Sequence, residues 1–406
     1  MTAPLRILCL DIEGGFGGSS RSLYESLSNM DRRGVDLEVW CRSEGPVRAK
    51  YELLGIPCRN VPGLPKMNSL RSFTRNIFGY AVWLRDFLKW RQQRQELVQS
   101  LREQFDLVHF NHEGLFGLAW WLRRKHNKAQ TMHVRTMVSD NAFGHCQSRL
   151  MIKTNDRLVF ITENERDNLE RLAGTASDGA VIYNAASKPS SEIAPHPAVP
   201  RDARLKIAIL SNYAHVRGID RIVDIAAELS ARGRRDILFV VAGDMRLRGS
   251  LPGELGRIAR ANGTLADYAA MRGVADMILF LGHVPEPETV LVACDVVLKP
   301  TREANPWGRD ILEGLAAGKP VISIGHYSRF VESEVTGFLF PSYDGGAIAD
   351  AILQLDSNRD LCRRLGENAA RRIGELCDGP ARARDLLEVW RQAVATHRQS
   401  ELQSHG

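Results

Sequence analysis

The stretch Arg302-Glu-Ala-Asn-Pro-Trp-Gly-Arg-Asp-Ile-Leu-Glu313 follows a short apolar run and continues into Gly-Leu-Ala-Ala-Gly-Lys-Pro320. It joins a polar turn, which contains Pro306 and Gly308, to a segment of helical composition. This pattern predicts a strand, a loop and a helix that begins near Asp310. A loop that opens a helix presents free backbone N–H groups, and such groups bind anions.

Short β-branched runs alternate with longer helical patterns on both sides of this stretch, which is typical of βαβ units and parallel sheets. Residues 185–204 contain four prolines and little apolar periodicity, so 187–204 is predicted to be a linker. The sequence thus predicts an α/β protein with one domain over 1–186 and a second over 205–379. The expected strands are 6–12, 35–41, 106–111, 130–135, 157–161, 180–183, 206–211, 237–242, 277–281, 296–299 and 321–324, and one helix is expected over 253–272.

The composition is that of a soluble globular protein. The chain has 406 residues, 44% hydrophobic and 25% charged, which suits two domains. No apolar run is long enough to span a membrane, and the first apolar run resembles a buried strand more than a signal peptide. Seven cysteines without a CxxC pair indicate reduced thiols in the cytoplasm and argue against a disulfide or zinc framework.

Residues 66–94 interrupt the alternating pattern, and the helical segment that contains them extends to 104. They include seven basic residues, one acidic residue (Asp86) and six interleaved aromatic residues. Such a segment is typical of a helix on an anionic membrane surface, here the inner face of the cytoplasmic membrane. An ordinary amphipathic helix with aromatic side chains in the core is an equal alternative. No further basic or stacking motif supports nucleic-acid binding.

Four stretches occur in an order that has a counterpart in a known family. They are GGSSR at 17–21, VIYN at 181–184, LSNYAHVRGID at 210–220, and the segment 300–320. Taken together, they resemble the retaining, nucleotide-sugar-dependent glycosyltransferases of family 4 (glycosyl transferases group 1). The resemblance covers nearly the whole chain and is strongest in the second domain.

The resemblance implies the GT-B fold, in which two Rossmann-like domains have parallel sheets that face an interdomain cleft. The second domain would bind the nucleotide-diphosphate sugar, the first domain would bind the acceptor, and the helical segment 380–406 would return to the first domain. No cofactor is expected beyond the sugar nucleotide as co-substrate. No D-x-D follows a strand of the second domain, so no metal site is expected.

Two departures from the family pattern affect the diphosphate site. Arg217 stands at the position of the family's phosphate-binding Lys and can bind phosphate bidentately. Asn212 replaces the family's Arg, so one cation is missing. Arg309, at the start of the expected helix, could supply it. Alternatively, Arg309 forms an ion pair with Glu313 one turn along the helix.

The sugar and nucleoside positions are assigned from the same resemblance. Glu313 matches the ribose-binding carboxylate, and Asn305 stands where the family has a sugar-binding Glu. Glu303 could take that role if the loop, which is one residue longer here, is reshaped. Pro306 and Trp307 replace the family's Gly-Phe, and Trp307 and Gly308 are assigned to the donor loop. Trp307 either walls the sugar pocket or packs under the loop. Backbone groups near Val284 would hold the base.

In the first domain, the glycine loop at Gly17 and Gly18 is assigned to donor binding, because it allows close approach of a ligand to a helix N-terminus. His112 follows the strand 106–111 and resembles the family's catalytic-site His. His109 lies three residues earlier and points to the other face of the sheet by strand alternation. The imidazole of His112 could orient or polarise a hydroxyl group.

The predicted function is therefore transfer of a sugar to an acceptor hydroxyl with retention, on a glycan or lipid-linked acceptor in cell-surface polysaccharide or glycolipid assembly. A soluble small-molecule acceptor is the alternative within this class. Two alternatives lie outside it. A degenerate sugar-nucleotide-binding module is suggested by Asn212 and Asn305, and a sugar-nucleotide epimerase would need no acceptor.

Overall fold

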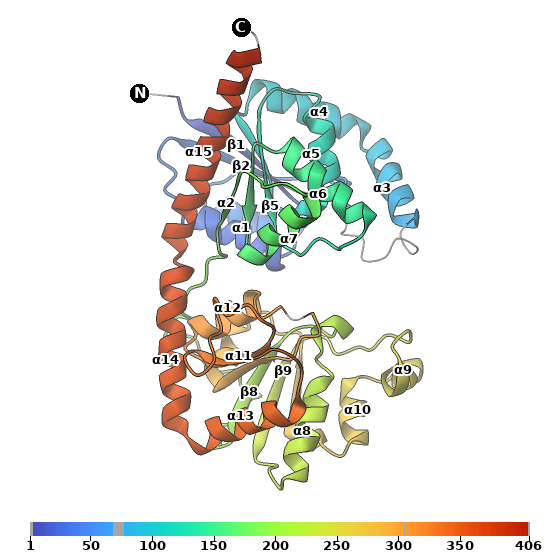
Figure 1. Cartoon of the computed structure of the whole chain (residues 1–406), viewed down its shortest axis with the longest axis vertical. Helices are drawn as coiled ribbons and strands as arrows, with labels where there is room; N and C mark the ends of the chain where they lie inside the picture. The colour runs from blue at the N-terminus through green and yellow to red at the C-terminus, as the bar shows by residue number, and fades with distance from the viewer. Residues whose placement is uncertain (1–2, 68–76, 304, 405–406) are drawn as a thin grey trace. The chain divides into compact units, whose positions relative to one another are not determined.

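The computed structural model describes residues 3–67, 77–303 and 305–404 (Figure 1). The chain forms two compact units, one of Met1–Ala185 with Gly379–Gly406 and the other of Ala186–Asp378. The proline-rich segment 187–204 has no helix or strand but belongs to the second unit, where His196 N donates to Thr289 O at 2.9 Å. Most of its residues are exposed and only Val199 is buried, so it is an irregular surface segment that contacts unit 2.

Unit 1 contains a seven-stranded parallel sheet of order β3-β2-β1-β4-β5-β6-β7. Six of its strands are predicted from the sequence to within two residues at each end. The strand β3 is missed because it is short and contains the polar residues Arg59 and Asn60. The strands are β1 (Leu5–Asp11), β2 (Val35–Cys41), β3 (Cys58–Asn60), β4 (Leu107–Phe110), β5 (Ala129–Val134), β6 (Arg157–Phe160) and β7 (Gly179–Val181).

Helices cover both faces of this sheet, as a parallel sheet requires. One hydrophobic core joins the sheet to α1, α2 and α15, and a second core joins its other face to α4, α5, α6 and α7. The helices are α1 (Gly18–Ser28), α2 (Val47–Leu53), α3 (Ile77–Lys89), α4 (Arg91–Glu103), α5 (Phe116–Leu122), α6 (Ala142–Thr154), α7 (Glu163–Ala173) and α15 (Gly379–Ser404), with a 3-10 turn η2 (Glu113–Leu115).

The C-terminal helix α15 is attached to unit 1 by a buried polar chain. Trp390 Nε1 donates to His109 Nδ1 at 3.2 Å, and His109 Nε2 lies 2.9 Å from His133 Nδ1. With Nδ1 as acceptor, the proton of His109 lies on Nε2. Burial lowers the pKa of His109 to about 3, so the ring is neutral. His109 therefore has a structural role on the face of the sheet that α15 covers.

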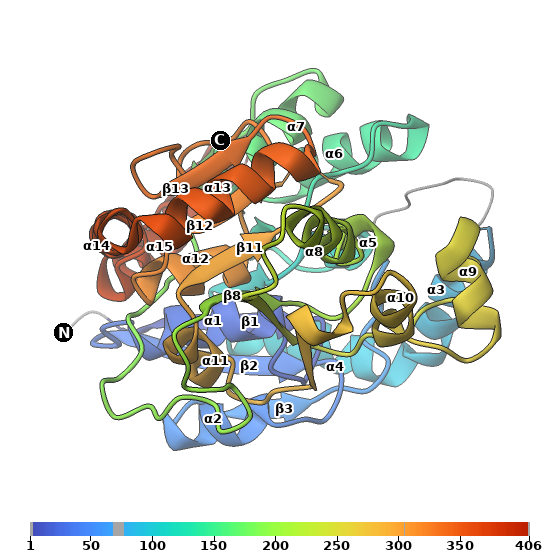
Figure 2. The ribbon, with the colours of Figure 1, turned by 90° about the horizontal axis from the view of Figure 1, so that it is seen from below.

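Unit 2 contains a six-stranded parallel sheet of order β10-β9-β8-β11-β12-β13. Figure 2 shows β8 and β11 side by side within it. The short edge strand β13 was not predicted. The strands are β8 (Leu205–Leu210), β9 (Ile237–Ala242), β10 (Ile278–Gly282), β11 (Val296–Lys299), β12 (Val321–Ile324) and β13 (Gly337–Phe340).

One predicted helix of unit 2 is wrong. The segment 253–272 forms two helices, because Asn262 has a left-handed φ of 60° and Thr264 begins a new helix with a capping box to Asp267. The helices are α8 (Arg221–Ala231), α9 (Gly253–Arg260), α10 (Leu265–Met271), α11 (Glu288–Ala293), α12 (Arg309–Ala316), α13 (Gly345–Ser357) and α14 (Arg359–Leu376), with 3-10 turns η3 (His215–Arg217) and η4 (Ala275–Met277).

Each sheet has one point where the strand order reverses. In unit 1, β1 lies between β2 and β4, and in unit 2, β8 lies between β9 and β11. Loops that leave two such strands diverge to opposite faces of the sheet and open a crevice at the carboxyl ends, where α/β proteins bind ligands. The glycine loop follows β1, His112 follows β4, the Arg217 loop follows β8 and the segment 300–313 follows β11. In the part of the chain that the structure describes, no helix has the length and apolar character to cross a membrane.

Acid stability tests the role of His109. An unfolded histidine takes up a proton below about pH 6.5, whereas folded His109 does not until about pH 3, so stability is lost as the pH falls through this window. We expect His109→Gln to reduce the slope of unfolding free energy against pH by about 1.4 kcal/mol per pH unit. Urea unfolding between pH 7 and 5 measures it, with exposed His283→Gln as the control. Equal slopes in all three proteins would contradict the neutral state.

Candidate functional site

The loops after β8 and β11 are fastened together by Arg302. Its Nη1 donates to His215 O at 2.7 Å and to Asp220 Oδ1 at 2.8 Å, and the carboxylate of Asp220 is buried. Gly218 has a φ of 68°, and a Cβ there would lie 2.0 Å from Pro300 O. The backbones of the two loops are therefore in direct contact, and only glycine fits at this position.

Arg217 and Asn212 lie exposed in the loop after β8. Arg217 Nη1 donates to Ser211 Oγ at 2.6 Å. Asn212 Oδ1 accepts from Asp244 N at 2.8 Å, which attaches this loop to the turn after β9. The asparagine that replaces a cation thus has a defined structural contact.

Lys299, the last residue of β11, positions the loop that follows it. Its Nζ donates to Trp307 O and lies 3.2 Å from Asp310 Oδ1. Gly308 has a φ of 127°, and a Cβ there would lie 2.8 Å from this Nζ. The sequence interpretation missed Lys299, although a lysine that ends an otherwise apolar strand was a usable signal.

Arg309 and Glu313 form an ion pair on the first turns of α12. Arg309 Nε lies 2.9 Å from Glu313 Oε1, and the two side chains are 14% and 12% exposed. The structure therefore contains the ion pair that the sequence left as the alternative to phosphate binding by Arg309. A carboxylate fixed by a guanidinium remains able to accept hydrogen bonds on its other lone pairs.

The other residues singled out in this loop differ in their surroundings. Thr301 Oγ1 donates to Asn305 Oδ1 at 3.0 Å, and Glu303 is exposed. Trp307 is buried against Tyr327, with ring centroids 5.4 Å apart, so it packs under the loop. Val284 follows β10, two strands from β8, so the sheet order separates it from the β8 and β11 loops.

In unit 1, His112 caps the turn η2 after β4. Gly114 N donates to His112 Nδ1 at 2.9 Å, and Glu113 Oε2 lies 3.4 Å from the same nitrogen. Because Nδ1 accepts a backbone proton, the neutral ring carries its hydrogen on Nε2 and can donate it to a hydroxyl oxygen. The side chain is 20% exposed.

Gly17 and Gly18 lie at the N-terminus of α1, after the neighbouring strand β1, and both are exposed. A Cβ on Gly17 would lie 3.0 Å from Glu13 Oε2. The structure thus places the glycine loop and His112 after adjacent strands of unit 1. The Arg217, Asn305 and Glu313 segments follow adjacent strands of unit 2.

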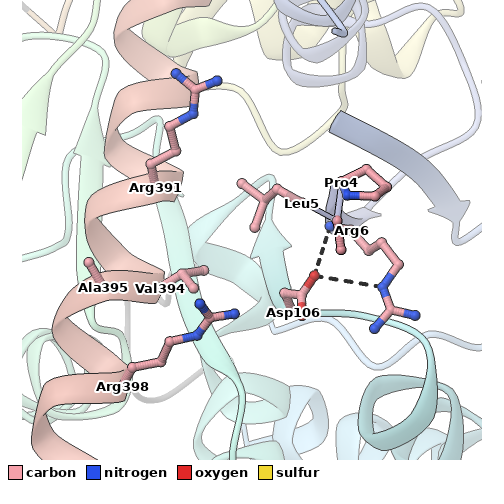
Figure 3. Close-up of a pocket in the computed structure, with 9 residues that line it drawn as sticks. Pro4, Leu5, Arg6, Asp106, Arg391, Val394, Ala395 and Arg398 are labelled. Atoms are coloured by element: carbon pink, nitrogen blue, oxygen red, sulfur yellow. Dashed lines mark hydrogen bonds and ion pairs between the residues drawn. The ribbon is translucent and has the colours of Figure 1, made fainter. Parts of the chain in front are cut away.

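A surface pocket of about 610 Å³ lies away from these residues, at the amino ends of β1 and β4 (Figure 3). Arg6, Arg391 and Arg398 line it, but their guanidinium groups point in different directions. They do not form a convergent anion site. Within residues 3–67, 77–303 and 305–404, no group of three His, Cys, Asp or Glu side chains is arranged to hold a metal ion.

Two family models match the chain. The model described as Glycosyl transferases group 1 matches residues 193–372, and the model described as Glycosyltransferase Family 4 matches residues 16–187. The first match contains the β8 and β11 loops, and the second contains the glycine loop and His112. The matched regions correspond closely to the two structural units.

Relatives and solved structures agree with these matches. The chain is 26% identical to a D-inositol 3-phosphate glycosyltransferase of Saccharomonospora viridis, over 95% of this chain and 92% of that protein. It is 22% identical to an alpha-D-kanosaminyltransferase of Streptomyces kanamyceticus, over 86% and 92%. The fold matches that of Anabaena HepE in complex with UDP and glucose, with a TM-score of 0.74 and 19% identity over 96% and 100%.

Substitution of Arg302 tests the connection between the two loops. Arg302→Met leaves the buried carboxylate of Asp220 without its cation, so we expect unit 2 to lose about 3 kcal/mol of unfolding free energy. Arg246→Met is the matched control, because Arg246 also pairs with an aspartate but is 85% exposed, and should cost less than about 0.5 kcal/mol. Urea unfolding measures the free energy of unfolding of both variants. Equal losses would show that the buried ion pair stabilises unit 2 no more than the exposed one.

Proposed function

The chain belongs to the group 1, family 4 glycosyltransferases, and we propose that it transfers a glycosyl group from a nucleoside diphosphate sugar to an acceptor hydroxyl with retention of anomeric configuration. The observation that carries the proposal is the Arg217 loop beside the N-terminus of α12, at the point where the unit 2 strand order reverses. A guanidinium and free backbone N–H groups are suited to a diphosphate.

The residues of unit 2 that the sequence singled out have the following proposed roles. Arg217 and the first N–H groups of α12 bind the diphosphate, and no metal ion or other cofactor takes part. Glu313, oriented by its ion pair with Arg309, accepts hydrogen bonds from the ribose hydroxyls. Asn305 and the adjacent Glu303 contact the transferred sugar. Backbone groups near Val284 contribute to the base site.

The reaction step follows from these roles. The acceptor oxygen forms a bond to the anomeric carbon on the face that the diphosphate leaves, and the bond between that carbon and the diphosphate oxygen breaks. The leaving diphosphate takes the acceptor proton, and Arg217 stabilises its charge. His112, with its hydrogen on Nε2, donates a hydrogen bond to a sugar hydroxyl, while Gly17 and Gly18 allow close approach of the donor.

The first acceptor class that we propose is a soluble polyhydroxylated molecule. Relatives named for D-inositol 3-phosphate and for kanosaminyl transfer match the chain over 95% and 86% of its length, unit 1 included. Hydrogen-bonding groups at the strand ends of unit 1 suit a polyol.

A lipid-linked acceptor in cell-surface polysaccharide or glycolipid assembly is a second candidate, favoured by α3. Trp83 of this helix stacks on Phe87 at 5.1 Å, and Phe87 contacts Trp121, so these aromatic side chains face the protein. On the other side, Leu84 and Leu88 are 51% and 59% exposed beside basic residues. This surface suits peripheral contact with an anionic membrane. Residues 68–76 of the basic segment lie outside the described residues.

The activity test uses UDP-, GDP- and ADP-sugars with inositol 3-phosphate and other polyols. We expect one donor to give a glycosylated product, with an α-linked donor giving an α-linked product by NMR. Arg217→Met should raise the donor KM about tenfold, because one charge-assisted hydrogen bond is lost. Arg246→Met, on the next loop, is the control and should leave KM within about twofold.

Other outcomes separate the alternatives. Conversion of the donor to another sugar nucleotide without acceptor would indicate an epimerase. Nucleotide binding without turnover across the acceptor panel would indicate a degenerate binding module. A product of inverted configuration would contradict retention while leaving transfer intact.

Vesicle flotation tests the second acceptor class. If α3 contacts membranes, the wild type should float with anionic vesicles at low salt and less so at high salt. The double variant Leu84→Gln/Leu88→Gln should lose at least about 80% of this binding, since two inserted leucines each contribute about 1.5 kcal/mol or more. Leu53→Gln, which alters a leucine 87% exposed elsewhere on unit 1, should bind as wild type. Absence of wild-type flotation removes this candidate.

A further inference from the structure

Arg135 is a buried cation immediately after β5, with only 9% of its surface exposed. Its Nε donates to Asn111 O at 2.8 Å, its Nη2 to Asn111 Oδ1 at 2.6 Å, and its Nη1 to Asn184 Oδ1 at 3.1 Å. One planar guanidinium therefore binds Asn111, just after β4, and Asn184, near the end of the segment Met1–Ala185 of unit 1.

The backbone around Arg135 also holds the residue beside His112. Arg135 N donates to Glu113 Oε2 at 2.9 Å, and the hydroxyl of Thr136 donates to Glu113 Oε1. The same Oε2 lies 3.4 Å from His112 Nδ1. Glu113 is fully buried, so its carboxylate has a fixed position against the imidazole.

The network continues from Asn111 to the glycine loop. Asn111 Nδ2 donates to Asp11 Oδ1 at 3.2 Å and to Ser19 O, in the first turn of α1, at 3.1 Å. The contacts of Arg135 thus extend along two routes. The backbone N–H reaches the turn of His112 through Glu113. The guanidinium reaches Asn111, next to His112 in the chain, and through it the start of α1, next to Gly18.

The charges in this network depend on Arg135. Asp11 and Glu113 are both fully buried, and burial raises the pKa of Asp11 while hydrogen bonds and Arg135 oppose the shift. Buried carboxylates are stable when a cation and hydrogen bonds accompany them. A substitution that removes the guanidinium would leave Asn111 with unpaired oxygens and free the turns that it holds.

We propose that Arg135 is a positioning residue of the transfer reaction, whose guanidinium fixes Asn111 and through it the next residue, His112, and the first turn of α1, while its backbone N–H holds Glu113. The inference rests on the proposed function, in which these two elements contact the transferred sugar and its donor. Arg135 itself is buried behind them and does not touch the reacting atoms. It acts by limiting the movement of groups that must be placed within about 1 Å.

The test compares Arg135→Ala and Arg135→Lys with Arg123→Met, which removes another partly buried arginine of unit 1 from its partner Asp156. We expect Arg135→Ala to lower kcat about 100-fold while the donor KM changes less than about threefold, because the diphosphate, ribose and base contacts belong to unit 2. Added guanidinium ion should restore kcat at least tenfold in Arg135→Ala and should not affect Arg123→Met. Arg135→Lys keeps the charge without the fork and should recover only part of the activity.

A second readout does not depend on turnover. In ¹⁵N NMR spectra, His112 of the wild type should be the Nε2–H tautomer, and the Arg135 variants should show a mixture of tautomers. If Arg135→Ala does not fold, the conservative variant Glu113→Gln is measured in its place. It keeps the side-chain shape and should show the same mixture of tautomers. If the wild type transfers no sugar, the proposed function fails, and the tautomer still decides whether Arg135 positions His112.

Two results would overturn the inference. One is an Arg135→Ala enzyme that retains more than about a third of the wild-type kcat. The other is an unchanged His112 tautomer in a folded variant whose activity guanidinium does not restore. The second result, together with an equal loss of thermal stability in Arg123→Met, would assign Arg135 to the general stability of unit 1.

Discussion

The ion pair between Arg302 and Asp220 is the contact on which the carboxyl edge of unit 2 depends. Replacing a buried ion pair by apolar residues often costs little stability, so its value here lies in geometry. Arg302 follows β11 and Asp220 ends the loop after β8, and the close contact of Gly218 with Pro300 needs both loops at one separation. With that separation set, Arg217 and the N-terminus of α12 are held on the same edge. A shift of either loop would separate them.

In unit 1 a different arginine, Arg135, holds the loops at the carboxyl ends of the strands. Parallel strands end together, so their last carbonyl oxygens crowd one edge where the ladder can no longer satisfy them. A guanidinium offers five donors in one plane and can serve several such oxygens. Arg135 does this for Asn111, and Arg221 does it for Pro300 and Thr301 of unit 2. Both arginines therefore place positive charge at the carboxyl ends of the strands, where α/β proteins bind ligands.

The part of this architecture that could be read from the sequence is the local part. Strands such as 35–41 and 296–299 are apolar and β-branched, and the Arg309–Glu313 pair follows from helical spacing. The edge strand β3 (Cys58-Arg-Asn60) is short and mostly polar, so it shows no strand pattern. Contacts between distant residues were not predictable, because Arg302 and Asp220 are 82 positions apart and nothing local in either segment indicates its partner. Arg135 was missed for the same reason.

Asn212 and Asn305, in the loops after β8 and β11, both have defined hydrogen bonds. Asn212 holds the backbone of Asp244, and Asn305 accepts from Thr301, so each neutral side chain is part of a loop and not a remnant of a lost charge. Three neighbouring cations, Lys299, Arg302 and Arg309, face carboxylates of this unit. Arg217 differs, since its hydrogen bonds within the described part of the chain go to the neutral oxygens of Ser211 and Asn212. Its charge is the one that an anionic ligand would meet without first displacing an acid, which favours an altered sugar pocket over a degenerate one.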